Sequence, residues 1–187
     1  MASPNITNAK RSLKHLLDQH FDIYLLQETH LPDVTQGKLW ETQWGGQTHW
    51  AAGTNRSAGV GLLLHPGSVV EVINHNTDME GSVLSAKLKL HEQTFQIINV
   101  YAPNKHSKCK TFFGNLWCLV FCNVDTVITG DFNCVPNVHF DKWGGDDAFE
   151  DKGIMHLHCF PESLSLEDIF RVKNPSTKLF TWFNGPQ

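Results

Sequence analysis

The chain has 187 residues, enough for one domain with a sizeable core, and 41% of them are hydrophobic while 18% are charged. This balance excludes an intrinsically disordered protein, and no apolar run is long enough to cross a bilayer. A formal net charge of -4 leaves a nucleic-acid binder open, because a site that gathers carboxylates around a cation is itself acidic. The polar residues 1–14 do not resemble a signal peptide, and five cysteines without paired spacing favour a reducing intracellular compartment, either nucleus or cytoplasm.

Helix and strand signals alternate along the chain, without repeats or linkers. Leucines at helical spacing predict a first helix between Thr7 and His20, and the apolar run Ile23–Leu26 predicts a buried strand. The strand at 84–90 alternates apolar and polar residues, which predicts one buried and one wet face, and the apolar strand at 126–129 is expected to be buried. Other strands are expected at 58–64, 69–73, 95–100 and 180–183, and helices at 107–122 and 166–172. This order predicts a single α/β domain over residues 1–187, a sandwich of mixed sheets flanked by helices.

Three polar clusters, residues 27–30, 99–104 and 130–133, each follow a predicted buried strand. Ligands of open α/β sheets bind just outside the carboxyl ends of strands, so these clusters are expected to converge on one site. Asp131 and Asn133 are two apart, which would point them to the same side of an extended segment. Any one of these residues alone is more simply a cap, an Asx turn or a packing group, but the three clusters together favour a site.

The clusters contain the groups that a metal-dependent reaction at phosphate needs. Glu28 and Asp131 can supply carboxylates to a hard cation such as Mg²⁺. Asn104, Asn133 and the hydroxyl of Tyr101 are donors suited to a phosphate whose charge grows in the transition state.

At these motifs the sequence resembles the endonuclease/exonuclease/phosphatase superfamily, which includes apurinic/apyrimidinic endonucleases and DNase I. The resemblance is greatest to the endonuclease domain of LINE-type (non-LTR) retrotransposons, and it covers nearly the whole chain. The matching segments are the glutamate motif Leu25–Leu31, the glycine-marked strand Ala58–Leu64, the motifs Asn99–Asn104 and Gly130–Asn133, and the late segment Asn174–Phe183.

The resemblance implies a four-layer α/β sandwich that hydrolyses DNA phosphodiester bonds with Mg²⁺, for which Mn²⁺ can substitute. Nicking would leave a 3′-hydroxyl that primes a reverse transcriptase domain of the parent protein, and no membrane is involved. Residue by residue, it implies that Glu28 is the metal ligand and that Asp131 activates or orients the attacking water, helped by Asn133. It further implies that Tyr101 and Asn104 contact the scissile phosphate and that Thr181 contacts DNA.

Two pieces of the family pattern have no counterpart in this sequence. Family members open with a strand carrying an active-site asparagine, and they end with a structural aspartate and a Ser-Asp-His motif. Met1 falls after the first piece and Gln187 falls before the second. We therefore expect a domain incomplete at both ends, lacking its first and last strands, with little or no nicking by this chain alone.

Two alternative functions remain open. One is a phosphoinositide or sphingomyelin phosphodiesterase of the same superfamily, although the sequence 101–104 points to DNA. The other is a non-catalytic remnant of a retrotransposon reading frame that binds metal or nucleic acid weakly.

Overall fold

A computed structural model describes residues 15–31, 33–53, 58–121, 123–144, 157 and 165–181. The chain divides into two compact units. The first, which we call the sheet unit, comprises residues 3–102 and 118–132, and the second, the helical unit, comprises residues 1–2, 103–117 and 133–187. That the two belong to a single domain stays a prediction. Among the described residues, no helix combines the length and the apolar character needed to cross a membrane.

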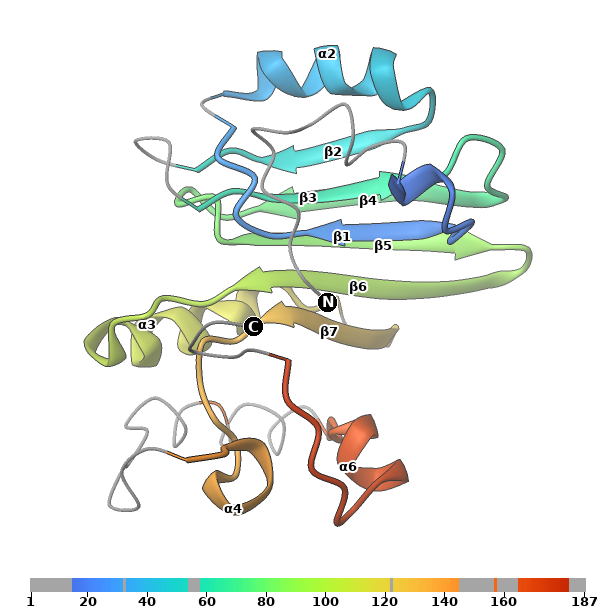
Figure 1. Ribbon diagram of the computed structural model, residues 1–187. Helices are drawn as coiled ribbons and strands as arrows, with labels where there is room; N and C mark the ends of the chain where they lie inside the picture. Colours follow the sequence, from blue (N-terminus) through green and yellow to red (C-terminus); the bar gives the residue numbers. More distant parts are fainter. Residues whose placement is uncertain are drawn as a thin grey trace. The chain divides into compact units, whose positions relative to one another are not determined.

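The sheet unit is built from two β-sheets. The smaller sheet is antiparallel, in the order β1 (Ile23–Leu26), β3 (Val60–Leu64), β2 (Thr48–Ala51). The larger sheet has the order β4 (Val70–Thr77), β5 (Val83–Leu90), β6 (Gln93–Tyr101), β7 (Asp125–Asp131). It is mixed, because β6 pairs with β5 antiparallel and with β7 parallel. Figure 1 shows these strands, with β6 and β7 side by side.

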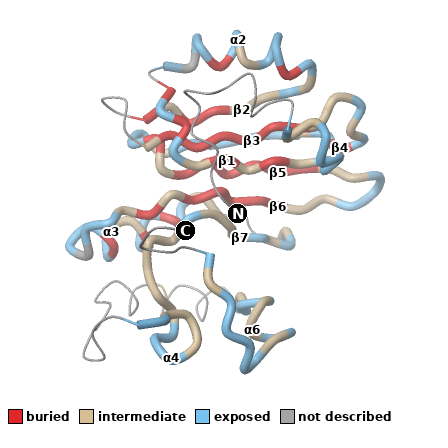
Figure 2. Tube along the Cα trace, in the orientation of Figure 1, coloured by how far each residue is buried: buried red, intermediate tan, exposed pale blue. Residues whose placement is uncertain are grey.

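The two sheets pack face to face around an aliphatic core. Leu62 of β3, Leu84 and Leu88 of β5 and Ile97 of β6 belong to this core, and the first three are 0% exposed. Figure 2 shows buried segments running through β2, β3, β5 and β6. Alternation of side chains along each strand places these residues on the inner faces of the sandwich. The predicted α/β sandwich with flanking helices is confirmed.

The other face of the small sheet is covered by helix α2 (Val34–Trp44), which lies over β2 in Figure 1. Asp33 caps its first turn by accepting hydrogen bonds from the backbone N–H groups of Thr35 and Gln36, at 2.8 and 3.1 Å. Trp44 is 2% exposed and packs against Tyr24 of β1 with ring centroids 5.2 Å apart. Neither α2 nor β2 was expected from the sequence, because α2 is mostly polar and β2 has only four residues.

The prediction that the 84–90 strand has one buried and one wet face holds for buried Leu84, Ala86 and Leu88 and for half-buried Lys87 and Lys89, but fails at Ser85. Ser85 and Gln96, both 0% exposed, lie on the outer face of the large sheet and share a hydrogen bond of 2.6 Å. The Ser85 hydroxyl donates to the Leu119 carbonyl at 3.0 Å, at the end of the short helix η3 (Trp117–Leu119). Ser85 is therefore buried and satisfied by hydrogen bonds, whereas Lys87 and Lys89 further along the same face are half-buried, a difference that alternation alone does not reveal.

Strand β7 also differs from its prediction. The segment 126–129 was expected to be a buried strand, yet Val127 is 53% exposed. Within the described residues, β7 lies at the edge of its sheet with β6 as its neighbour. The predicted last strand is not seen in its described part, since Phe180 and Thr181 are not in a strand, and residues 182–183 lie outside the described residues. The first predicted helix is described only from His15, with His15–Leu17 helical.

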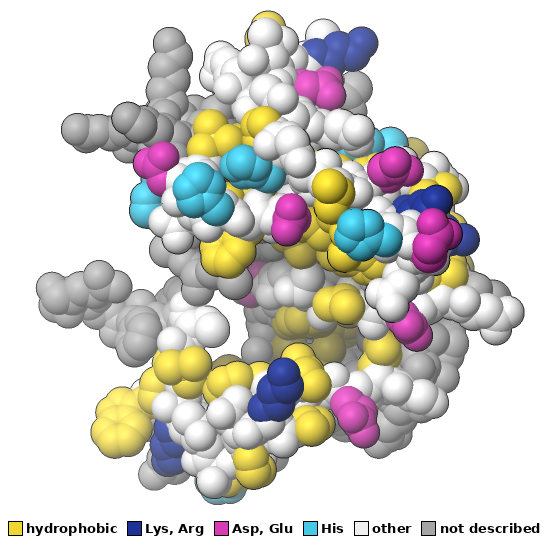
Figure 3. All heavy atoms as spheres, turned by 90° about the vertical axis from the view of Figure 1, so that its right-hand side faces the viewer, with side chains coloured by type: hydrophobic (Ala, Val, Ile, Leu, Met, Phe, Trp, Pro, Cys, Tyr) yellow, Lys and Arg dark blue, Asp and Glu magenta, His cyan; other side chains and the backbone are white. Residues whose placement is uncertain are grey.

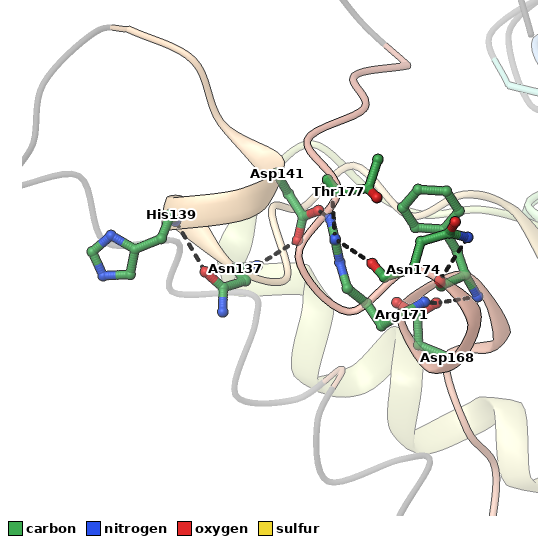
Figure 4. Close-up of polar contacts among 8 residues, drawn as sticks. Asn137, His139, Asp141, Asp168, Arg171, Asn174 and Thr177 are labelled. Atoms are coloured by element: carbon green, nitrogen blue, oxygen red, sulfur yellow. Dashed lines mark hydrogen bonds and ion pairs between the residues drawn. The ribbon is translucent and has the colours of Figure 1, made fainter.

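The helical unit contains α3 (His106–Leu116), α4 (Val138–Asp141) and α6 (Ile169–Lys173). Helix α3 was expected to reach residue 122, but it ends at Leu116, and α6 begins inside its predicted region 166–172 and ends just beyond it, at Lys173. Arg171 of α6 makes an ion pair with Asp141 at the end of α4 and donates to the carbonyl of Thr177 at 2.7 Å, as Figure 4 shows. Its guanidinium also lies 5.5 Å from the centroid of the Phe140 ring. One side chain thus ties α4, α6 and the following segment together.

A pair of histidines joins the two sheets of the sheet unit. The rings of His49 on β2 and His75 on β4 have centroids 4.5 Å apart. Figure 3 shows several histidine side chains exposed on the face that it draws. Within the described part of the chain, the Nε2 atom of His49 is buried with no hydrogen-bond partner. Burial, and then repulsion by His75, lower the pKa of His49 below 6.5, against a smaller opposite effect of Glu41.

This histidine pair predicts loss of stability in mild acid. A His whose folded pKa is lowered binds fewer protons folded than unfolded, so its contribution is fully present above pH 6.5 and is lost as pH falls toward the folded pKa. We expect the free energy of unfolding in urea to decline below pH 6.5 by less in His49→Gln than in the natural sequence. The exposed His91 supplies the control, and an equal effect of His91→Asn would contradict the assignment to His49.

Candidate active site at the carboxyl ends of β1, β6 and β7

Three of the site residues predicted from the sequence come at the ends of strands in the sheet unit. Gln27 alone separates the end of β1 from Glu28, while Tyr101 and Asp131 are the last residues of β6 and β7. The expectation that the polar clusters follow strands is therefore met by the structure. Glu28 and Asp131 are exposed and Tyr101 is half-buried, so both carboxylates can be reached from solvent.

These three residues lie together. The hydroxyl of Tyr101 donates a hydrogen bond of 2.6 Å to Oε1 of Glu28, although 73 residues separate them in the sequence. Tyr101 and Asp131 are direct partners in the parallel register of β6 and β7, which puts their side chains on the same face of the sheet. Tyr101 is therefore hydrogen-bonded to the Glu28 carboxylate and is the register partner of the residue that carries the Asp131 carboxylate. Such a group of oxygen ligands and a hydroxyl donor suits a divalent cation together with a phosphate.

Glu28 is held in an unusual backbone conformation. Its φ is +53° and that of His30 is +51°, both in the left-handed region that non-glycine residues seldom adopt. Two backbone hydrogen bonds of 3.0 Å hold the turn, from Thr29 N–H to the Gly59 carbonyl and from His30 N–H to the Ala58 carbonyl. The glycine-marked segment before β3 thus fixes the direction of Glu28. Conformations of this kind cost about 1–3 kcal/mol each and cluster at functional sites.

Asp131 is positioned by Gly130. The φ of Gly130 is +135°, and a Cβ at this position would overlap the carbonyl oxygen of Val100 on the neighbouring strand. Only glycine permits this close approach of β7 to β6. The backbone then continues the pairing, since the N–H of Ala102 donates to the Asp131 carbonyl at 2.8 Å.

The turn between β4 and β5 supports Tyr101 from the other side. The carboxylate of Asp78 accepts hydrogen bonds from the N–H groups of Ser82 and Val83, at 2.8 and 3.0 Å. The Ser82 carbonyl in turn accepts from the N–H of Tyr101 at 2.8 Å. Burial raises the pKa of Asp78, the nearby charge of Glu80 adds to the rise, and the backbone donors partly offset it.

The remaining predicted site residues belong to the helical unit. Asn104 is exposed just before α3, Asn133 is half-buried and Thr181 is exposed. Asn133 has a φ of +48°, so the extended conformation assumed in the prediction for Asp131 and Asn133 does not hold at Asn133. The roles of Asn104, Asn133 and Thr181 stay predictions that rest on the motifs.

The donor set fits a hard cation. Among the described residues, no three His, Cys, Asp or Glu side chains are grouped as potential metal ligands. A structural zinc site needs four such ligands, whereas Mg²⁺ is commonly held by one or two carboxylates with water and substrate phosphate. Glu28, with Asp131 nearby, matches the second pattern.

Two further residues of this region were not assigned a role from the sequence. Asn99, two residues before Tyr101 on β6, is 0% exposed, and Gln27 lies next to Glu28. Both lie inside the motifs that identified the site, so their positions in the sequence could have marked them as site residues. Their hydrogen bonds, however, cross from one sheet to the other, and no local pattern predicts such partners.

This chain is similar in sequence to a transposon protein, and no protein-family model matches it. The transposon protein is the transposon TX1 uncharacterized 149 kDa protein of Xenopus laevis, 26% identical over 174 residues. The match covers 91% of this chain and 13% of the length of the transposon protein.

Several solved structures of nucleases and a phosphatase share the fold of this chain. The 3′ phosphatase NExo (D146N) from Neisseria, bound to a product DNA hairpin, matches with a TM-score of 0.73 and 20% identity, over 96% of this chain and 75% of that chain. The APE2 catalytic domain of Xenopus laevis matches with a TM-score of 0.71 and 21% identity, over 93% of this chain and 71% of that chain. The AP endonuclease LMAP from Leishmania major matches with 0.70 and 14%, over 92% of this chain and 66% of that chain. The chain therefore has the endonuclease/exonuclease/phosphatase fold, the fold to which the motifs around Glu28 and Asp131 point.

Proposed function

We propose that this chain carries the catalytic centre of a Mg²⁺-dependent DNA phosphodiesterase, an endonuclease of the LINE type. The observation that carries the proposal is the 2.6 Å hydrogen bond from Tyr101 to Glu28 beside Asp131, which gathers two carboxylates and a hydroxyl at one end of the two sheets. Solved structures with this fold include AP endonucleases and a 3′ phosphatase bound to DNA, which supports a phosphodiester in DNA as the substrate class.

Each residue is proposed to have a distinct role. Glu28 would hold the cation, which when bound supplies Lewis acidity and neutralises charge on the phosphate. Asp131 would accept a proton from the attacking water and orient it. The Tyr101 hydroxyl donates its single O–H to Glu28 and keeps that carboxylate in place; to contact the phosphate, whose negative charge grows as the bond to water forms, it would have to transfer this hydrogen bond to a phosphate oxygen.

Residues of the helical unit complete the proposal. Asn133 would help to place the water, Asn104 would donate to the scissile phosphate and Thr181 would contact DNA. These three roles rest on the motifs 99–104, 130–133 and 174–183 rather than on measured contacts.

The relationship to a transposon protein favours a role in transposition. The similarity spans 91% of this chain but only 13% of that protein, so the activities and partners of a complete parent protein are themselves proposals. We propose that nicking leaves a 3′-hydroxyl that serves as a primer for a reverse transcriptase domain of the same polypeptide.

Nicking of supercoiled plasmid tests the proposal. It is measured with Mg²⁺ and with EDTA, for this chain and for the protein translated from the complete reading frame that contains it. In whichever of these two proteins nicks DNA, we expect Glu28→Gln to lower the rate of Mg²⁺-dependent nicking by about 10²-fold or more, because a preorganised group that stabilises charge is lost. Glu92→Gln, in the exposed turn between β5 and β6, should leave the rate unchanged.

Two outcomes would count against the proposal. Nicking that persists in EDTA would exclude the cation, and equal rates for Glu28→Gln and Glu92→Gln would exclude Glu28. If neither form of the protein nicks DNA, the non-catalytic alternative replaces the enzymatic one.

A further inference from the structure

A buried hydrogen-bond network connects the two sheets directly beneath the site. The side-chain amide of Asn99 on β6 donates to two carbonyls of the small sheet, that of Leu26 and that of Gly61, both at 3.0 Å. Leu26, the last residue of β1, and Gly61, near the start of β3, are register partners. A single amide of the large sheet therefore holds the end of the small sheet.

The chemistry of these partners fixes the orientation of the Asn99 side chain. Two carbonyl oxygens require two N–H donors, and the side-chain NH₂ of asparagine supplies two. The Oδ1 atom is then left to accept, and Nε2 of Gln27 donates to it at 2.7 Å. Gln27 must therefore present its nitrogen rather than its oxygen, and every donor in the chain of bonds from the two carbonyls to Gln27 faces an acceptor.

The network holds the turn that follows β1 and carries Glu28. Gln27 is joined to Asn99, and the next residue, Glu28, is joined to Tyr101, two positions further along β6. Side chains of alternate residues on β6 point to the same face, so Asn99 and Tyr101 hold consecutive residues of one turn. Glu28 also has its left-handed φ of +53°, which needs support from its surroundings to persist.

We propose that Asn99 and Gln27 are positioning residues that hold the Glu28 carboxylate in its cation-binding position. This inference rests on the proposed function. Neither residue is a cation ligand in it; they act through the turn that carries Glu28. Hydrogen-bonded partners behind metal ligands typically change metal affinity by about 10- to 100-fold when removed.

The test measures Mg²⁺ affinity in the folded chain, with no dependence on catalysis. The sequence contains two tyrosines, Tyr24 and Tyr101, so 3-fluorotyrosine labelling gives two ¹⁹F resonances. We expect Mg²⁺ to shift the resonance of Tyr101, the hydrogen-bond partner of Glu28. Tyr24 donates instead to the Leu16 carbonyl at 2.6 Å, and its resonance should not shift.

Four variants separate positioning from stability. Gln27→Ala removes the hydrogen bond that a half-buried side chain makes to Asn99, and Asn99→Ala removes the whole bridge. Both should raise the Mg²⁺ dissociation constant about tenfold or more. Val70→Ala, in the aliphatic core, should lower stability without changing this constant, and Asn76→Ala, exposed on β4, should change neither.

The outcomes are distinguishable. Unchanged Mg²⁺ affinity in Gln27→Ala, with binding by the natural sequence, overturns the positioning role but not the proposed function. If Asn99→Ala fails to fold, Gln27→Ala alone decides. Absence of any Mg²⁺-dependent shift in the natural sequence overturns the proposed function and this inference with it.

Discussion

Replacing Asp131 by alanine is expected to lower Mg²⁺-dependent nicking by about 10⁴-fold or more in the form of the protein that nicks DNA, since catalytic residues that act as a unit carry effects of this size. Asp131 is the last residue of β7 and is exposed, and its backbone carbonyl, which accepts from Ala102, is retained in the variant. The fold should therefore survive. The measurement is the initial rate of plasmid relaxation at saturating Mg²⁺.

Asp125 supplies a matched control at the opposite end of the same strand. It is also an exposed aspartate of β7, paired with Phe95, far along the strand from the Tyr101 pair. Asp125→Ala should nick at the rate of the natural sequence, and circular dichroism should show both variants folded. Equal activity of Asp131→Ala and Asp125→Ala would remove Asp131 from the mechanism.

Gly130→Ala is expected to destabilise the chain by about 2–6 kcal/mol, the sum of a strained backbone and an overpacked contact. The φ of Gly130 is +135°, a region that L side chains rarely adopt, and the added methyl group would meet the backbone of Val100. The strand must move away from β6 to relieve this contact, which would also displace Asp131. Urea denaturation, followed by fluorescence, measures the loss of stability.

Gly114 offers the comparison. It lies inside helix α3 with nothing near the position of an added Cβ, so Gly114→Ala should stabilise by about 0.5–1 kcal/mol through helix propensity. If Gly130→Ala proved as stable as Gly114→Ala, the close approach of β7 to β6 would not be needed for the fold.

The sequence was most informative where local chemistry and position coincide. Strand β1 was predicted to the residue from its apolar run, and the three clusters lie at strand ends as expected. The α/β sandwich followed from the order of elements. Glu28 and Asp131 were recognisable because each sits in a short motif after an apolar strand, where glycine or a turn redirects the chain.

What the sequence did not reveal depends on contacts between distant segments. Ser85 is buried on the outer face of β5 because it bonds with Gln96 and Leu119, which lie 11 and 34 residues away in the sequence. The exposure of Val127 depends on β7 being at the edge of its sheet among the described residues. The bridge through Asn99 joins residues 72 and 73 positions apart, so neither periodicity nor motif spacing could identify it.

Crystals of the chain soaked in Mn²⁺ would test the metal-dependent site most directly, because the anomalous signal of the ion locates it without reference to activity. We expect one strong peak within coordination distance of the Glu28 carboxylate, about 2.0–2.3 Å, on the side of Tyr101 and Asp131. A strongest peak at another place, such as the His49–His75 pair, or no peak near Glu28, would contradict it.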